Sequence, residues 1–187
     1  MNQEVTGKKE KKKKSIVREV FGLAFFLILL FCLAWLLIHF VGERMQVDGE
    51  SMYPVLSDGD QLIIDKVSYQ FKDPKRFDVV VFPFQYRDGT CLIKRVIGLP
   101  GETVRITDGQ VYINGRLLDD PYGYEPIRNA GLASGLVTLG KDEYFVLGDN
   151  RNNSTDSREP SIGNITRSSI IGRAWMRVWP LNGLRLL

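Results

Sequence analysis

Hydrophobic residues fall into one long run near the start of the chain and many short runs after it. Residues 20–42 contain no Asp, Glu, Lys or Arg over 23 positions. As a helix this run would rise about 35 Å, which is enough to cross a hydrocarbon layer of about 30 Å. A buried soluble helix and a cleaved leader are the alternatives. The run is long for both, and residues 43–46 offer no small-x-small cleavage site. The pattern predicts a single transmembrane anchor over 20–42.

After residue 43 the apolar residues form short runs that are rich in β-branched and aromatic types and bounded by turn residues. They predict strands over 61–64, 78–82, 91–99, 103–106, 111–113, 144–147 and 170–179. Asp108-Gly109 and Asn114-Gly115 are typical of tight hairpin turns. One helical turn is expected over 166–169, and an irregular loop over 119–140, where Gly and Pro recur. We therefore expect a mainly β protein, with an antiparallel β domain over 43–187.

Basic residues are concentrated ahead of the apolar run. Residues 1–19 carry seven Lys or Arg against three Glu, a net charge of +4, whereas the whole chain carries +3. The excess positive charge therefore belongs to the tail and does not indicate a nucleic-acid-binding face. Because positive charge beside a first span resists translocation, we expect 1–19 to be cytoplasmic and 43–187 to lie outside the cytoplasm.

The distribution of histidine and cysteine excludes several kinds of catalytic site. The only histidine, His39, lies in the apolar run, so the domain after residue 43 has none. This excludes Ser-His-Asp and Cys-His catalysis, and zinc sites built on histidine, unless another chain supplies the imidazole. Cys32 lies in the predicted span and Cys91 beyond it, so a disulfide between them is implausible. We expect no metal and no cofactor.

Ser51 and Lys94 are the candidates for nucleophilic chemistry. Ser51 lies in a turn between Gly49 and Pro54, where an ordinary turn serine is the alternative. Lys94 shares its strand face with Leu92 and Val96, and apolar neighbours lower the pKa of a lysine. Its alternative is a lysine whose head group reaches water. With no histidine in this domain, the base for Ser51 must be a carboxylate or a lysine.

The third polar stretch, residues 148–158, follows an apolar strand directly. It contains two aspartates and two arginines, which we expect to pair with one another and hold the loop in place. A solvated loop is the alternative, and the spacing does not match an EF-hand calcium loop. Either Ser154 or Ser157 could orient a neighbouring ammonium group.

Three stretches, in this order after a single apolar span, resemble the conserved boxes of bacterial type I signal peptidases (leader peptidases, peptidase family S26), in particular short Gram-positive-type members. The stretches are Gly49-x-Ser51-Met52-x-Pro54, Lys94-Arg95-Val96-Ile97-Gly98-x-Pro100-Gly101-Glu102, and Gly148-Asp149-Asn150-Arg151-x-Asn153-Ser154-x-Asp156-Ser157-Arg158. The resemblance implies a membrane-bound serine endopeptidase with a Ser-Lys dyad. Such an enzyme cleaves the signal peptides of exported preproteins after small-x-small motifs, at the lipid bilayer and close to the secretion translocase.

Carried over by position, the resemblance assigns Ser51 as nucleophile, Lys94 as general base and Ser154 as the serine that hydrogen-bonds the lysine. Structural positions around the site are Arg95, Asp149, Arg151, Asp156, Ser157 and Arg158. The implied fold is mainly β with a long hairpin, and residues 105–140 correspond to the variable insertion. Met52 is expected to help line the first substrate pocket.

Two positions depart from the family pattern. Val55 stands where the family usually has Thr, so any hydrogen bond from that hydroxyl is absent. Gly49 stands where some members place a serine that helps the oxyanion hole. The oxyanion hole must then rest on backbone N–H groups, for which Ser51 is the first candidate and Gly49 the position to examine.

Two non-peptidase interpretations remain at this point. The chain could be a non-enzymatic β module, anchored by one span, that binds an export or envelope partner. A transpeptidase-like envelope enzyme is disfavoured, because the predicted external domain offers no histidine or plausible cysteine nucleophile. Cleavage of an Ala-x-Ala peptide that is lost on Ser51→Ala distinguishes a peptidase from a binding module.

Overall fold

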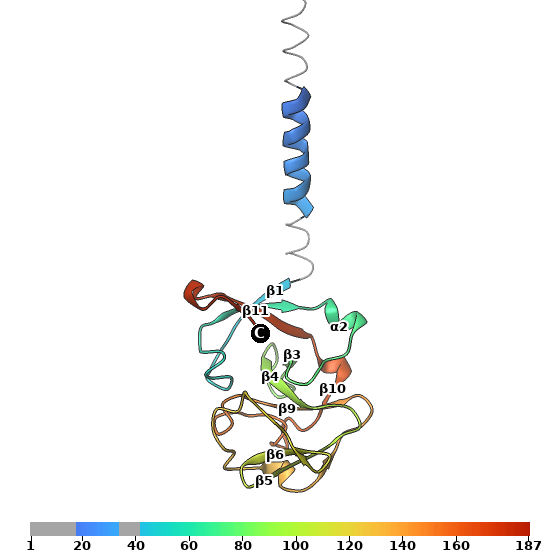
Figure 1. The fold of residues 1–187 in the computed structure, drawn as a ribbon, viewed down its shortest axis with the longest axis vertical. Helices are drawn as coiled ribbons and strands as arrows, with labels where there is room; N and C mark the ends of the chain where they lie inside the picture. The colour runs from blue at the N-terminus through green and yellow to red at the C-terminus, as the bar shows by residue number, and fades with distance from the viewer. Residues whose placement is uncertain (1–17, 34–41) are drawn as a thin grey trace, which may run out of the picture. The chain divides into compact units, whose positions relative to one another are not determined.

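The computed structural model describes residues 18–33 and 42–187, and the chain divides into two units, Met1–Val41 and Gly42–Leu187 (Figure 1). In the first unit, residues 18–33 are helical. Among the described residues, no helix combines the length and the apolar character needed to span a membrane. Part of the predicted tail (1–17) and part of the predicted span (34–41) lie outside the described residues. The anchor over 20–42 therefore stays a prediction.

The second unit is built on an eight-stranded antiparallel sheet in the order β1-β2-β11-β3-β4-β9-β10, with β12 paired to β11. Its strands are β1 (Gly42–Gln46), β2 (Gln61–Asp65), β3 (Val79–Pro83), β4 (Cys91–Gly98), β9 (Glu143–Leu147), β10 (Ile165–Thr166), β11 (Gly172–Trp179) and β12 (Arg185–Leu186). The mainly β, antiparallel prediction is confirmed. β1 was not predicted, and it begins at Gly42, the last residue assigned to the anchor.

A second, four-stranded antiparallel sheet has the order β7-β6-β5-β8. Its strands are β5 (Thr103–Thr107), β6 (Gln110–Ile113), β7 (Arg116–Leu117) and β8 (Val137–Thr138). Asp108 (φ 52°) and Gly109 (φ 76°) join β5 to β6, and Asn114 (φ 51°) and Gly115 (φ 75°) join β6 to β7. Two consecutive residues with positive φ define the tight hairpin turn that Asp-Gly and Asn-Gly favour. Both predicted hairpins are confirmed.

Helical segments in residues 42–187 are short. They are α2 (Ser68–Phe71) and three 3₁₀ turns, η1 (Gly131–Ser134), η2 (Arg167–Ser169) and η3 (Leu181–Gly183). The helical turn expected over 166–169 is η2. The loop expected over 119–140 contains only η1 and the two-residue strand β8.

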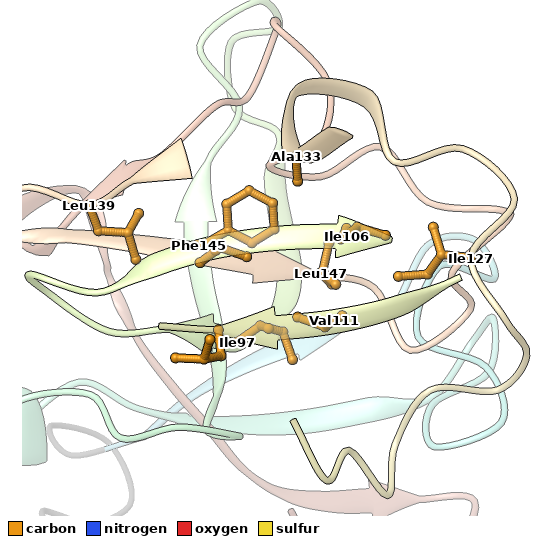
Figure 2. Close-up of a cluster of buried hydrophobic side chains, with 10 residues drawn as sticks. Ile97, Ile106, Val111, Ile127, Ala133, Leu139, Phe145 and Leu147 are labelled. Atoms are coloured by element: carbon orange, nitrogen blue, oxygen red, sulfur yellow. The ribbon is translucent and has the colours of Figure 1, made fainter. Parts of the chain in front are cut away.

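Buried side chains form three clusters, one of which lies where the two sheets meet (Figure 2). It joins residues of β5 and β6 to Ile97 of β4 and to Phe145 and Leu147 of β9. The other two clusters pack on β3 from opposite sides. Val79 and Val81 belong to one, and Val80 and Phe82 to the other. β3 is therefore buried on both faces, as its unbroken apolar sequence indicates.

Candidate active site

Ser51 lies in the loop between β1 and β2, and this loop is fixed by its own hydrogen bonds. The N–H of Gly49 (φ 89°) donates to Asp58 Oδ1 at 2.9 Å. The N–H of Tyr53 donates to the carbonyl of Glu50 at 3.1 Å. Met52, next to the serine, is 1% exposed and packs in the cluster with Val79 and Val81. Burial of Met52 therefore anchors the turn, while Ser51 itself stays partly exposed.

Lys94 reaches Ser51 from β4, 43 residues along the chain. Its Nζ lies 2.8 Å from Ser51 Oγ and donates to the carbonyl of Ile93 at 3.0 Å. On the neighbouring strand, Lys94 is paired with Val80. The lysine is 2% exposed, so its head group does not reach water. The fold thus brings together the two residues that were predicted as nucleophile and base.

Burial lowers the pKa of the Lys94 ammonium from 10.5 to about 8. The cause is the loss of hydration, which disfavours the charged form. The carboxylates of Asp156 and Asp149 oppose this shift, because nearby negative charge favours the ammonium. The predicted desolvation of Lys94 is confirmed. A lysine in this state is available as a base near neutral pH.

The arginines and aspartates around the site form buried ion pairs. Arg95 contacts both carboxylate oxygens of Asp149, at 2.7 and 2.6 Å, and Arg158 contacts both of Asp156, at 2.8 Å each. The two aspartates are fully buried. Bidentate contacts of this kind fix both orientation and position. The expectation that the charges of residues 148–158 pair with one another holds only for Asp156 and Arg158, because Asp149 pairs with Arg95 of β4 and Arg151 with Asp120.

The loop that begins at Gly148 packs directly against the Ser51 turn. The backbone N–H of Asn150 donates to the carbonyl of Ser51 at 3.1 Å, and its side-chain amide donates to the carbonyl of Glu50 at the same distance. A Cβ at Gly148 would lie 2.4 Å from the Ser51 carbonyl oxygen, closer than atoms can approach. Glycine is therefore required for this contact. Sequence reasoning had assigned no role to Asn150 or to the absence of a side chain at position 148.

Ser157 and Arg151 support the loop from behind. The hydroxyl of Ser157 accepts a hydrogen bond from the N–H of Val146 in β9 at 2.9 Å. Arg151 donates to the carbonyl of Gly148 at 3.0 Å and pairs with Asp120. Both residues hold the segment that contacts Ser51, in line with the structural role assigned to them.

Ser154 does not make the contact that was predicted for it. Its hydroxyl oxygen is buried and has no hydrogen-bond partner among the described residues. Lys94 Nζ is instead placed against Ser51 Oγ and the Ile93 carbonyl. Ser154 does lie against Gly148, where an added Cβ would meet its hydroxyl oxygen at 2.3 Å. Ser154 is thus a neighbour of the site, and its predicted hydrogen bond to Lys94 is corrected.

The backbone N–H groups of the Ser51 turn differ in their availability. That of Gly49 is occupied by Asp58, so the expectation that it serves the oxyanion hole is corrected. That of Ser51 donates no hydrogen bond within the part of the chain that the structure describes. Ser51 therefore remains the candidate donor for an oxyanion.

Three residues of the loop over 119–140 reach the site, which sequence reasoning did not predict. The ring of Tyr122 lies 3.6 Å from the guanidinium carbon of Arg95, and the ring of Tyr124 packs edge-on against Tyr53, with 5.2 Å between centroids. Asp120 pairs with Arg151. No pattern in this irregular stretch indicates such contacts. In residues 18–33 and 42–187, no group of three or more His, Cys, Asp or Glu side chains is placed to hold a metal.

One edge of β4 is open next to Lys94. β3 pairs with Cys91 to Arg95 on one side. On the other side, β9 begins to pair only at Arg95, opposite Leu147. Among the described strands, none covers residues 91–94 on that side. An extended peptide could therefore add to the sheet here, with its end at Ser51.

Comparison with known proteins matches the family model described as signal peptidase, peptidase S26, over residues 18–179. Signal peptidase I of Leptolyngbya laminosa is 44% identical over 152 residues, covering 78% of this chain and 72% of the relative. Probable signal peptidase I-2 of a Synechocystis species is 42% identical over 155 residues, 79% of this chain and 68% of the relative. Signal peptidase I T of Bacillus subtilis is 37% identical over 187 residues, covering 96% of this chain and 94% of the relative. The chain belongs to the signal peptidase family, peptidase S26.

Proposed function

We propose that this protein is a membrane-bound serine endopeptidase that cleaves signal peptides from exported preproteins, with Ser51 as nucleophile and Lys94 as general base. The observation that carries the proposal is the 2.8 Å distance between Lys94 Nζ and Ser51 Oγ. The lysine is buried and has its pKa lowered to about 8. The names of its relatives supply the substrate class.

The chemistry is acyl transfer through a covalent intermediate. Neutral Lys94 accepts the hydroxyl proton of Ser51 while Oγ attacks the scissile carbonyl. The backbone N–H of Ser51 faces the oxygen that gains negative charge. Lys94 then returns the proton to the departing amine, which leaves an acyl ester on Ser51. A water molecule, deprotonated by Lys94, hydrolyses this ester and regenerates the serine.

Substrate binding uses the open edge of β4. Residues before the cut lie extended along residues 91–94 and form main-chain hydrogen bonds with that edge. Because side chains alternate in an extended peptide, the first and third residues before the cut face the protein together. Met52 and Ile93 are buried in the same cluster, and Ile93 is itself part of this edge. Such a packed floor accepts small side chains and rejects bulky ones.

Membrane attachment follows from the sequence of the N-terminal part. Residues 1–19 form a basic cytoplasmic tail, 20–42 a single span, and 43–187 the extracytoplasmic catalytic domain. This topology places Ser51 close to the bilayer surface, where signal peptides leave the secretion translocase. Residues 105–140 form the variable insertion and contribute Asp120, Tyr122 and Tyr124 to the surroundings of the site.

The test uses the full chain in lipid vesicles and a preprotein with Ala-x-Ala before the scissile bond. The wild-type protein should release the signal peptide, and Ser51→Ala should release none. Ser57→Ala is the matched control, since Ser57 lies in the same loop and only its backbone forms hydrogen bonds among the described residues. Ser57→Ala should cleave at the wild-type rate. Cleavage that survives Ser51→Ala contradicts the proposal, and binding without cleavage by the wild type would favour the non-enzymatic module.

A further inference from the structure

A cleft of about 590 Å³ lies along the second sheet, within the usual size range of ligand sites. Its apolar part includes Val111 of β6 and Leu118, which follows β7. Asp108, from the β5–β6 turn, and Asp119 lie on its wall. The cleft thus offers apolar contact together with carboxylates. The mechanism described above does not use it.

The cleft is electronegative because its charges do not cancel. Among the described residues, Arg151 is the only basic one that lines it, and Arg151 is already paired with Asp120. Glu125 is paired with Arg128 at its rim. Asp108 and Asp119 are exposed, and neither takes part in an ion pair of the described residues. Two carboxylates are therefore available to a cationic group that enters the cleft.

Tyr124 connects the cleft to the Ser51 turn. It lines the cleft, and its ring packs edge-on against Tyr53, two residues after the nucleophile. The backbone N–H of Tyr124 donates to the carbonyl of Asp149 at 3.0 Å, so this contact is held by the same loop that fixes Ser51. Tyr124 therefore belongs both to the wall of the cleft and to the surroundings of the Ser51 turn.

The strand pairing of β4 decides which part of a substrate lies near the cleft. Residues before the cut occupy the edge over 91–94 and end at Ser51. From Arg95 onward that edge is covered by Leu147 of β9, so the peptide must leave the sheet beyond the scissile bond. Beyond the scissile bond the peptide passes the Ser51 turn, where Tyr53 contacts Tyr124 of the cleft wall.

We propose that this cleft is a binding subsite for the first residues of the mature protein, after the cut, and that it prefers lysine and arginine there. The inference rests on the proposed function and adds a specificity on the far side of the scissile bond. Lysine and arginine fit because their apolar stems lie on Val111 and Leu118 while their charged ends reach Asp108 and Asp119.

The experiment compares three peptides cut by the full chain in detergent micelles. All three share Ala-x-Ala before the scissile bond. They differ at two positions, chosen among the second to fifth residues after the bond, where one peptide has Lys at both, one has Gln at both and one has Glu at both. Two partly solvated ion pairs support about a fivefold higher kcat/KM for the Lys peptide than for the Glu peptide. The preference should shrink at high salt, because exposed charges are screened.

The double variant Asp108→Asn/Asp119→Asn should bring the Lys-to-Glu ratio to about one. Asparagine tolerates the positive φ of position 108, so the hairpin is kept. Asp142→Asn removes one exposed carboxylate outside the cleft and should keep the wild-type ratio. Equal rates on all three peptides in the wild type, or a preference that survives the double variant, would overturn the inference while the proposed function stands. Failure to cut even the Gln peptide would overturn the proposed function itself.

Discussion

The protonation of Lys94 should set the pH dependence of cleavage. Burial lowers its pKa from 10.5 to about 8. A shift of this size corresponds to about 3 kcal/mol of lost stabilisation of the ammonium. At pH 7 about one Lys94 side chain in ten is then neutral, compared with about one in three thousand for a lysine at its ordinary pKa. Burial thus supplies roughly three hundred times more active base at that pH.

The assay is kcat/KM on an Ala-x-Ala peptide from about pH 6 to about pH 10, with the full chain in detergent micelles. The rate should rise about tenfold per pH unit at low pH and level off above about pH 8. Lys72→Met, which removes an exposed lysine, is the control and should keep this profile. A midpoint near that of histidine, or no pH dependence, would refute the role given to Lys94.

Three further predictions concern the residues that build the site. Lys94→Met should raise the free energy of unfolding by up to about 3 kcal/mol at pH 7. The unfolded lysine binds more protons than the folded one between about pH 8 and 10.5, so wild-type stability rises with pH there and the advantage of Lys94→Met disappears. Urea unfolding of both proteins at each end of this pH range checks this, and a difference in unfolding free energy that does not change with pH would contradict it. Asp149→Asn should cost about 3–5 kcal/mol, because it leaves the buried Arg95 unpaired; a loss under about 1 kcal/mol in the same assay would contradict it. Gly148→Ala should lower kcat at least about tenfold, since its Cβ must push the Ser51 backbone away, and an unchanged kcat would show that the loop contact does not position the serine.

The strands that could be predicted from the sequence are those whose residues are buried. The run that became β3 is apolar at each position because both of its faces are covered. The Asp-Gly and Asn-Gly turns identified the hairpins of the second sheet, because few other residues adopt two successive positive φ values. β1 and β12 were missed, because they lie at the margin of the sheet with mostly exposed side chains. These two segments are strands because their backbones pair with neighbouring strands, and no sequence pattern indicates that pairing.

Elimination limited the chemistry of the site without choosing its residues. With no histidine after residue 43, the base for Ser51 had to be a carboxylate or a lysine, and the resemblance to type I signal peptidases assigned Lys94. The details that depend on three-dimensional packing were not predictable. The Gly49 N–H donates to Asp58, and the hydroxyl of Ser154 makes no hydrogen bond to the lysine, because local loop geometry decides both. The contact of Tyr124 with the Ser51 turn joins residues far apart in the sequence.

The proposed mechanism requires Ser51 to form a covalent acyl intermediate with the help of Lys94. A peptide ester that ends in Ala-x-Ala, mixed with the full chain and quenched rapidly, should leave an acyl group on the protein that intact mass and peptide mapping place on Ser51. The adduct should be absent in Ser51→Ala and should form far more slowly in Lys94→Ala. Continued turnover with no adduct, or an adduct on another residue, would contradict the account.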